Sequence, residues 1–480
     1  MCAVVSRRPR RYVYAGRSGG ELAAKSESES ETAFGPGAGK RQSGAGSSVR
    51  ATRVRWNVLT LVMLATGLTY LDRVNLSIAG HYIQTELHFG TETMGWIFSA
   101  FLLGYALMQV PGGWAGDRFG SRKVLALAIL WWSAFTMLTG LAPRLPIAAW
   151  LGVAASFMVV RFLVGVGEAA CSPTNNKIVS NWIGSNARGL GTSFSILGIG
   201  LGGAVTPPLI AWIMQRWGWR SSFYISGAIG VVFAALWFAY VRDTPEEHPK
   251  VNAEELRLLE RARSRTPKMR EAPANAPWKK LLSDRSVWGL LIGYFCQGYP
   301  IYFYYTWFFI YLVRVRGLTV SEGGIWGMLP YLSIALLAPF GGAFSDFASK
   351  RLGKTNGRRA AVWLGMFLSA ALLWFGSRSS SSVAAILLLA GASGCNMFAA
   401  TSYWAACIDL TQEFAGSLSG LMNTAGNLGG WLSPILTAYI ATHFGWERAL
   451  DVAALVTAGA GLSFALVSAG KSLDSTAAEF

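Results

Sequence analysis

The chain has 480 residues, of which 52% are hydrophobic and only 14% are charged. Soluble proteins carry about 25% charged residues, so the composition argues against a soluble globular protein. Lys and Arg exceed Asp and Glu by 42 to 25, which in a soluble protein would suggest a nucleic-acid partner. In so apolar a chain we instead expect basic cytoplasmic loops, no nucleic acid and no cofactor. The five cysteines follow no metal-ligand spacing, so no metal site is expected.

Residues 1–52 form a polar segment that is rich in Arg, Ser and Gly. The segment lacks the apolar core of a secretory signal, and its composition predicts a disordered cytoplasmic tail. An organellar transit peptide is the alternative, because the first twenty residues contain arginines and no acidic residue.

Twelve apolar stretches follow, six before and six after a polar stretch, and each fits the roughly 20 helical residues that span a bilayer. We predict an all-α membrane protein with twelve transmembrane helices in two six-helix pseudo-symmetric halves. The halves are expected at 53–241 and 286–470, with a cytoplasmic linker at 242–285 and a cytoplasmic tail at 471–480. The predicted spans are 56–80, 94–114, 122–142, 147–170, 189–214, 221–241, 286–313, 323–345, 358–376, 382–408, 416–441 and 447–469.

The distribution of Lys and Arg and an internal repeat support this architecture. Basic residues gather in the tails and the even-numbered connections, which places both termini in the cytoplasm of a multi-pass protein of the cell (inner) membrane. Residues 206–213 resemble residues 433–440 at an offset of 227, and 112–117 resemble 341–346 at an offset of 229. Such repeats build two related halves with a binding site between them.

Two pairs of ionisable residues lie inside predicted spans, where each charge costs roughly 2.5–3.5 kcal/mol on insertion scales. Asp72 and Arg73 are adjacent in span one, and Arg161 and Glu168 lie seven residues apart on one face of span four. Arginine can hold a carboxylate by two hydrogen bonds, and a carboxyl group in an apolar cavity can carry a proton. The pattern predicts an anion site with proton coupling; purely structural ion pairs are the alternative.

The loop after span two contains Gly113, Asp117, Arg118, Gly120, Arg122 and Lys123. Small residues permit close helix packing, and the charged residues can pair across the halves. The loop resembles the signature loop of the major facilitator superfamily, which implies a role in gating. The alternative is that its positive charges only fix the topology.

Residues 70–76 and 161–176, with Thr306-Trp307 and Tyr311-Leu312, resemble the anion:cation symporter family of that superfamily, whose bacterial members import galactonate, glucarate and hexuronates. The resemblance runs from Arg55 to about Ala469. It implies proton coupling at Asp72 and Glu168. The substrate-binding residues that it implies are Arg73, Arg161, Tyr70, Tyr105, Ser402, Trp404 and Asn427.

Asn423 and Asn427 lie four residues apart on one helix face, which suits hydrogen bonds to a polyol substrate; contacts between helices are the alternative. In span seven, Gln297, Tyr302 and Tyr305 are further candidates for the cavity wall. At Ile199 the chain departs from the glutamine of galactonate-type relatives, which favours a different sugar acid or a less hydroxylated anion.

The resulting hypothesis is a secondary transporter, not an enzyme, that imports a small organic anion with protons across the bilayer by alternating access. A sugar acid such as a hexuronate, glucarate or galactonate is the expected substrate, and a monomer is the expected state. One alternative is a phosphate or other carboxylate transporter or exchanger of the same family. A second alternative is a membrane sensor that does not transport.

Overall fold

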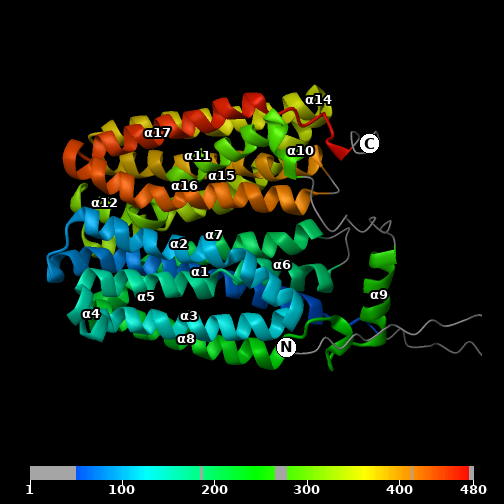
Figure 1. Ribbon diagram of the computed structural model, residues 1–480, viewed down its shortest axis with the longest axis horizontal. Helices are drawn as coiled ribbons and strands as arrows, with labels where there is room; N and C mark the ends of the chain where they lie inside the picture. Colours follow the sequence, from blue (N-terminus) through cyan, green and yellow to red (C-terminus); the bar gives the residue numbers. More distant parts are fainter. Residues whose placement is uncertain (1–49, 184–187, 265–277, 412–413, 475–480) are drawn as a thin grey trace, which may run out of the picture. The chain divides into compact units, whose positions relative to one another are not determined.

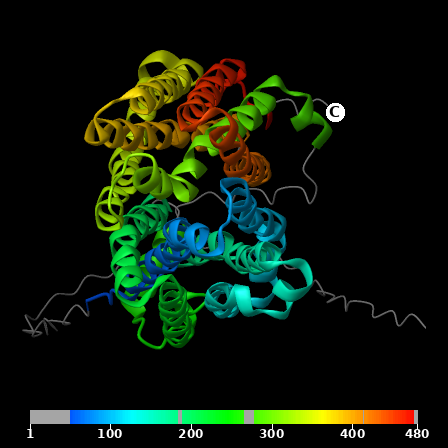
Figure 2. The same ribbon diagram turned by 90° about the vertical axis from the view of Figure 1, so that its left-hand side faces the viewer.

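The computed structural model describes residues 50–183, 188–264, 278–411 and 414–474. The predicted disordered tail, up to residue 49, lies outside this range. The described residues are helical apart from turns and short connections, and they form two bundles that face each other (Figures 1 and 2). Helices α1–α8 form the first half and α11–α17 the second. This arrangement confirms the predicted all-α class and its two six-helix halves.

The first half contains α1 (Val54–Leu87), α2 (Thr91–Phe119), α3 (Ser121–Leu141), η1 (Ala142–Arg144), α4 (Pro146–Leu151), α5 (Val153–Glu168), α6 (Cys171–Trp182), α7 (Arg188–Trp217) and α8 (Trp219–Tyr240). The connecting stretch holds η3 (Pro245–Glu247), α9 (Ala253–Ser264) and α10 (Trp278–Ser283). The second half contains α11 (Arg285–Thr306), α12 (Phe308–Arg314), α13 (Val320–Trp326), α14 (Leu329–Arg378), α15 (Ser382–Leu410), α16 (Ala415–Phe444), α17 (Trp446–Ser463) and η4 (Phe464–Leu466). The exact limits of the two halves and of the linker stay predictions.

Several predicted spans are built differently from single helices. Span four comprises α4 and α5 and is continued beyond its predicted end by α6, and span seven comprises α11 and α12. Spans eight and nine share α14, which turns back at Gly353. The φ angle of Gly353 is 79°, a value that costs a glycine little and strains other residues.

Nine helical segments within the described ranges are long and apolar enough to cross a membrane, and the segment 320–378 makes two passes. The two remaining passes are α11–α12 and α16, and their polar side chains include Gln297, Asn423 and Asn427. Polar residues within a span face the interior of the bundle or a wet cavity. We therefore expect these three side chains to face the interior of the molecule.

The contacts between the halves repeat with the offsets seen in the sequence. A Cβ atom built on Gly95 of α2 would lie 3.0 Å from the Cβ of Ala438 of α16, and one built on Gly324 of α13 would lie 2.9 Å from the Cβ of Ala211 of α7. Because glycine lets helix backbones approach closely, these two equivalent contacts pack α2 against α16 and α13–α14 against α7. The sequence repeat is therefore matched by equivalent helix contacts in the structure.

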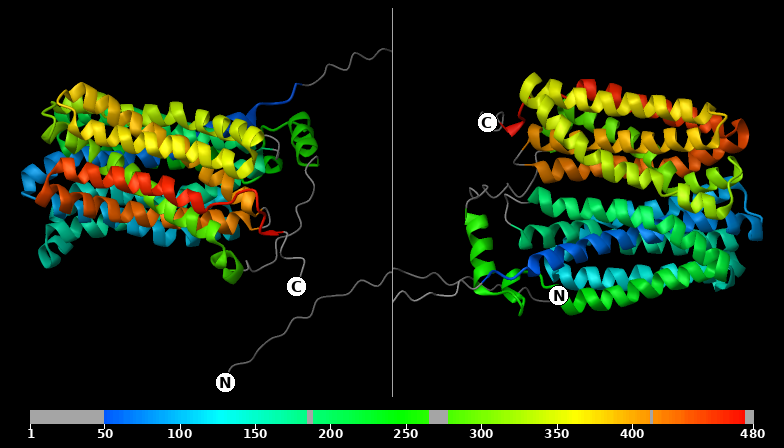
Figure 3. Two further views of the ribbon diagram at one scale, coloured as in Figure 1. Left: turned by 90° about the horizontal axis from the view of Figure 1, so that it is seen from above. Right: turned by 180° about the vertical axis from the view of Figure 1, so that it is seen from behind.

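We call the end of the bundles where α1 begins and α17 finishes the tail end, and the opposite end the far end. Figure 3 shows α9 beyond the helices at the tail end. Glu255 of α9 is fully buried there and accepts hydrogen bonds from the Thr52 hydroxyl at 2.6 Å and from the backbone N–H groups of Val54 and Arg55 at 3.2 Å each. The connecting stretch thus caps the first turn of α1, whose own N-cap residue, Arg53, provides no side-chain cap.

Candidate functional site

The four ionisable residues predicted inside the spans gather between α1 and α5. Arg73 donates from Nε to Oε2 of Glu168 at 2.8 Å, and the Glu168 side chain has no exposed surface. Close packing of α2 on α5 at Gly104 and Gly165, where a Cβ would overlap the neighbouring backbone, brings these helices together. The ion pair between Arg73 and Glu168 links α1 to α5 through two residues that are 95 positions apart in sequence.

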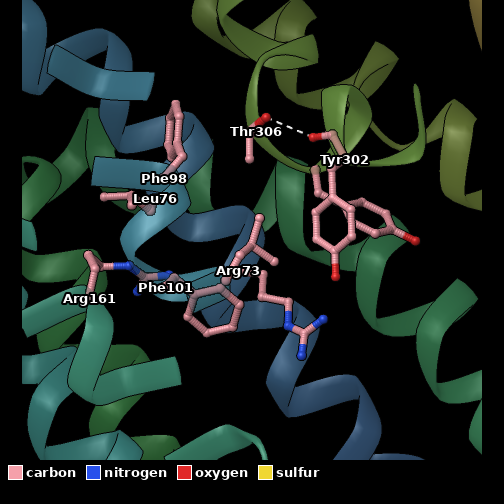
Figure 4. Close-up of a pocket in the computed structure, with 9 residues that line it drawn as sticks. Arg73, Leu76, Phe98, Phe101, Arg161, Tyr302 and Thr306 are labelled. Atoms are coloured by element: carbon pink, nitrogen blue, oxygen red, sulfur yellow. Dashed lines mark hydrogen bonds between the residues drawn. The ribbon is translucent and has the colours of Figure 1, made fainter. Parts of the chain in front are cut away.

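Arg161 is the unpaired cation of this group. The residue is 2% exposed, and its Nε and Nη1 atoms have no hydrogen-bond partner among the described residues. The Phe101 ring packs against both arginines, with its centre 5.1 Å from each guanidinium carbon. Figure 4 shows this ring between Arg161 and Arg73. A buried guanidinium without a partner is costly, so Arg161 has donors available for an anion.

Asp72 lies in the same electrostatic neighbourhood but faces α3. The residue is 1% exposed, its charge interacts with those of Glu168 and Arg161, and Trp132 and Thr136 of α3 are the donors that face it. Its Oδ1 atom, the Trp132 Nε1 and the Thr136 hydroxyl all lack a hydrogen-bond partner in the described residues. Asp72 is thus a buried carboxylate that faces two hydrogen-bond donors of α3.

A cavity of about 20 Å³ lies beside the two arginines, which is enough for roughly one water molecule and too small for a sugar acid. Its wall includes Arg73 and Arg161 as predicted, and Tyr302 and Tyr305 from span seven (Figure 4). Sequence reasoning missed the other lining residues, which are Leu76, Phe98, Phe101, Leu102 and Thr306. The spacing of 98, 101, 102 and 105, which marks one face of a helix, was the available signal.

Tyr70 and Tyr105 flank Arg73 and do not themselves line the cavity. The Tyr105 ring centre is 4.7 Å from the Arg73 guanidinium carbon, and its hydroxyl lies 3.4 Å from that of Ser172. The Tyr70 hydroxyl donates to that of Tyr305 at 3.5 Å, across the two halves. These rings hold the guanidinium of Arg73 by cation–π contact.

The predicted residues of the second half have other partners in this conformation. The hydroxyl of Ser402 donates to that of Ser345 at 2.9 Å, and Nε1 of Trp404 donates to the Tyr294 hydroxyl at 2.9 Å. Neither Ser402 nor Trp404 belongs to the cavity wall.

The amide groups of Asn423 and Asn427 both donate to Oε1 of Gln109 on α2, at 3.1 Å each. The Tyr302 hydroxyl donates to Oδ1 of Asn427 at 3.3 Å. Asn427 is therefore one hydrogen bond away from the cavity wall, and Gln109 is a contact that the sequence analysis did not single out.

The loop predicted to act in gating lies at the tail end, and the partners found for its charged groups come from the first half and from the start of the connecting stretch. Asp117 forms an ion pair with Lys177 of α6 at 2.8 Å. The backbone N–H of Arg122 donates to Asp243 at 2.8 Å, and Gly120, with φ of 90°, leaves room for that carboxylate. Among the described residues, neither Asp117 nor Arg122 forms an ion pair or hydrogen bond with the second half in this conformation, so the predicted pairing across the halves stays a prediction.

The remaining loop residues contribute packing. A Cβ on Gly113 would contact Pro173 at 3.3 Å, and the Arg118 guanidinium carbon lies 5.6 Å from the Trp114 ring centre. Lys123 is exposed. The loop therefore braces α2 against α6 in this conformation.

Chemically, the site combines two fixed cations with two buried carboxylates. Arginine remains charged under physiological conditions, whereas a buried carboxyl group can gain or lose a proton. Protonation of Glu168 would release the guanidinium of Arg73, and protonation of either Glu168 or Asp72 would remove one of the negative charges near Arg161. Anion binding and proton uptake can therefore favour each other here. Within the described ranges, no group of three or more His, Cys, Asp or Glu residues could hold a metal ion.

Comparison with known proteins gives matches along most of the chain. The profile of the Major Facilitator Superfamily matches residues 62–434. The chain is 32% identical over 403 residues to a probable galactarate/D-glucarate transporter of Escherichia coli K12, covering 82% of this chain and 90% of that protein. It is 31% identical over 395 residues to a probable sulfoacetate transporter of Cupriavidus necator, covering 82% and 89%. A bacterial homologue of the human lysosomal transporter Spinster has a similar fold, with a TM-score of 0.69 at 16% identity over 87% of this chain and 98% of that one.

Proposed function

Because the chain belongs to the Major Facilitator Superfamily, a family of transporters, we propose that it imports an organic anion together with protons by alternating access. The observation that carries the proposal is Arg161, a buried guanidinium with two unpartnered nitrogen atoms beside the cavity. Buried donors of one charge without hydrogen-bond partners favour a ligand of the opposite charge. No enzymatic role is implied.

Charge balance supports proton coupling in the proposal. Asp72, Arg73, Arg161 and Glu168 carry no net charge when all four are ionised, so an anion would add an uncompensated negative charge to a buried region. A proton on Asp72 or Glu168 offsets that charge. We therefore assign proton coupling to these two carboxylates and substrate binding to Arg161 and Arg73, with Tyr70 and Tyr105 as supports of Arg73.

The direction of transport follows from the proposed orientation. We place the tail end, with both termini and its basic loops, in the cytoplasm of a cell with an inward proton gradient across its inner membrane. The cross-half hydrogen bonds of the described residues reach from Arg314–Thr85 at the far end to Gln109–Asn423. This pattern is consistent with halves that are closed toward the outside, so that the proton and the anion leave toward the cytoplasm. The proposed working unit is a monomer.

The proposed substrate class is a sugar acid such as glucarate, galactonate or a hexuronate. The support is the similarity to a protein named as a galactarate/D-glucarate transporter, together with a cavity wall that combines arginines with tyrosine and threonine hydroxyls. A second candidate is another anion, because arginine binds carboxylate, sulfonate and phosphate through the same donors and another relative is named for sulfoacetate.

The test is uptake into proteoliposomes of labelled glucarate, galactonate, glucuronate, galacturonate and phosphate, with and without an inward proton gradient. Gradient-stimulated uptake of a sugar acid is the expected result. Uptake of phosphate alone would replace the sugar-acid assignment by the second candidate. Uptake that does not respond to the gradient would remove the proton coupling, and no uptake of any anion would contradict the transport proposal itself.

A further inference from the structure

Three amide side chains connect the two halves next to the cavity. Gln109 extends from α2 of the first half, and Asn423 and Asn427 lie on one face of α16 of the second half. Both asparagine amide groups donate to the single Oε1 atom of Gln109, at 3.1 Å each. The carbonyl oxygen of Asn427 accepts from the hydroxyl of Tyr302, which lines the cavity. A continuous series of hydrogen bonds therefore leads from the cavity wall to Gln109.

In this cluster, two amide donors share a single acceptor oxygen. Gln109 supplies one acceptor oxygen, and the two asparagines direct N–H groups from two helical positions toward it. Asn427 is 7% exposed, so its N–H groups need an acceptor that the surrounding protein provides. The geometry is that of a site for an oxygen atom between two amide donors, with a neutral carbonyl in place.

We propose that Gln109 is an internal stand-in for the substrate: its Oε1 occupies, in this conformation, the position that a substrate oxygen takes between Asn423 and Asn427. The inference rests on the proposed transport of an anion. An ionised oxygen accepts hydrogen bonds that are roughly twice as strong as those of a neutral carbonyl. An anionic or polyhydroxyl substrate therefore displaces Gln109 and engages both amides, and Gln109 lowers the apparent affinity by competition.

The same exchange connects binding to the movement of the halves. Because Gln109 belongs to the first half and both asparagines to the second, their hydrogen bonds form a direct cross-half link. Substrate that takes over the two amides breaks the link. Binding thereby removes one of the contacts that hold α2 to α16, while the hydrogen bond from Ser99 to the Trp431 backbone oxygen remains.

The experiment measures the KM for labelled glucarate, glucuronate, galactonate and phosphate in proteoliposomes under a fixed inward proton gradient. Gln109→Met removes the acceptor and keeps the side-chain length, and Gln109→Leu is a second apolar variant in case the first folds poorly. Competition predicts a KM about three- to tenfold below that of the wild type, since one hydrogen bond contributes up to about a factor of ten. Gln109→Glu, a permanently stronger acceptor that also repels an anion, is expected to raise KM at least about tenfold.

Gln215 provides the matched control. Its Nε2 donates to the Ser321 hydroxyl across the halves at 2.9 Å, at the far end and outside the cavity wall. Gln215→Leu removes a cross-half amide contact of the same kind and is expected to leave KM unchanged.

Two outcomes overturn the inference alone. If Gln109→Met and Gln109→Leu raise KM and Gln109→Glu restores it, Gln109 positions the asparagines and does not compete with substrate. If all three variants keep the wild-type KM, the cluster does not contact substrate. Absence of uptake of all four anions by the wild type is a different result, because it contradicts the proposed function and the inference together.

Discussion

The two halves pack their helices alike and contribute different chemistry to the cavity. The ionisable residues of the site come from α1 and α5 of the first half: Asp72, Arg73, Arg161 and Glu168. The second half lines the same cavity with uncharged residues of α11, namely Tyr302, Tyr305 and Thr306. Repeated glycine contacts fix the backbone, while the side chains at the centre have diverged. A symmetric scaffold thus places a charge-binding face opposite a neutral hydrogen-bonding face.

In the proposed mechanism, the two halves therefore have different roles. Changes in the first half should affect whether an anion binds and whether protons drive its entry. Changes in the second half should affect which anion fits and how tightly it binds. Variants in matched positions can break this division or sharpen it.

The largest effect is expected for Arg161→Ala. Loss of the unpartnered guanidinium leaves Asp72 and Glu168 opposite one cation and removes the anion's charged donors, so sugar-acid uptake should fall at least about 100-fold. Arg161→Lys keeps the positive charge but cannot form two parallel hydrogen bonds to a carboxylate, so its uptake should lie between that of the wild type and that of Arg161→Ala. The control is Arg220→Ala, which removes a partly exposed arginine of the same half that pairs with Glu86 at the far end. Normal uptake by Arg161→Ala would show that the anion binds elsewhere.

Glu168→Gln is expected to separate transport from the proton gradient. The variant cannot ionise, so the guanidinium of Arg73 stays available and protonation no longer controls it. Exchange of internal for external anion should continue, while stimulation of net uptake by an inward proton gradient should disappear. Glu86→Gln, at the far end, is the matched carboxyl control. Full stimulation in Glu168→Gln would assign the coupling to Asp72 alone.

A smaller effect is expected from Tyr302→Phe in the neutral half. The change deletes the hydroxyl that donates to Asn427, and loss of one neutral hydrogen bond should raise KM by about two- to tenfold. The response to the proton gradient should remain that of the wild type. Tyr304→Phe serves as the control, because that hydroxyl donates to the backbone oxygen of Leu389, outside the cavity wall. A loss of gradient stimulation in Tyr302→Phe would contradict the division between the halves.

The smallest effect on transport is expected from Glu255→Ala in α9. The carboxylate caps the start of α1 from the connecting stretch, so its loss should lower the free energy of unfolding by about 1–2 kcal/mol. Thermal unfolding in detergent measures this change, and KM should not change. Glu254→Ala is the control, since the Glu254 side chain is partly exposed and pairs with Arg257 three residues away. Equal unfolding temperatures for the two variants would show that the cap is not stabilising.

Part of the site could be predicted from the sequence because membrane insertion penalises charge. Charged residues within apolar spans are few enough to identify by reading, and Arg73 and Arg161 indeed line the cavity. Which of these charged residues form an ion pair with each other could not be predicted from the sequence. Arg161 and Glu168 share a helix face, yet Glu168 pairs with Arg73 of α1, because the long Arg73 side chain reaches from its own helix to the Glu168 carboxylate.

Neutral cavity residues carried no comparable signal. Phe101 lies between two guanidinium groups, but a phenylalanine in an apolar helix is equally compatible with lipid or with the core. Asn423 and Asn427 were found from their spacing, whereas their partner Gln109 lies 314 and 318 residues away. A hydrogen bond between distant helices depends on how those helices are placed, which no local pattern records.

The sequence by itself determined the number of passes, the two-fold repeat and the residues whose charge demands a polar environment. These properties follow from local hydrophobicity and from the cost of burying charge, which are the same wherever the helix packs. The tertiary structure alone decided that Glu168 pairs with Arg73, that two nitrogen atoms of Arg161 find no hydrogen-bond partner in the part of the chain that the structure describes, and that Gln109 accepts from two asparagines of the other half. Those choices depend on distances of a few ångströms between helices, which glycine contacts and side-chain packing set only once both halves have assembled.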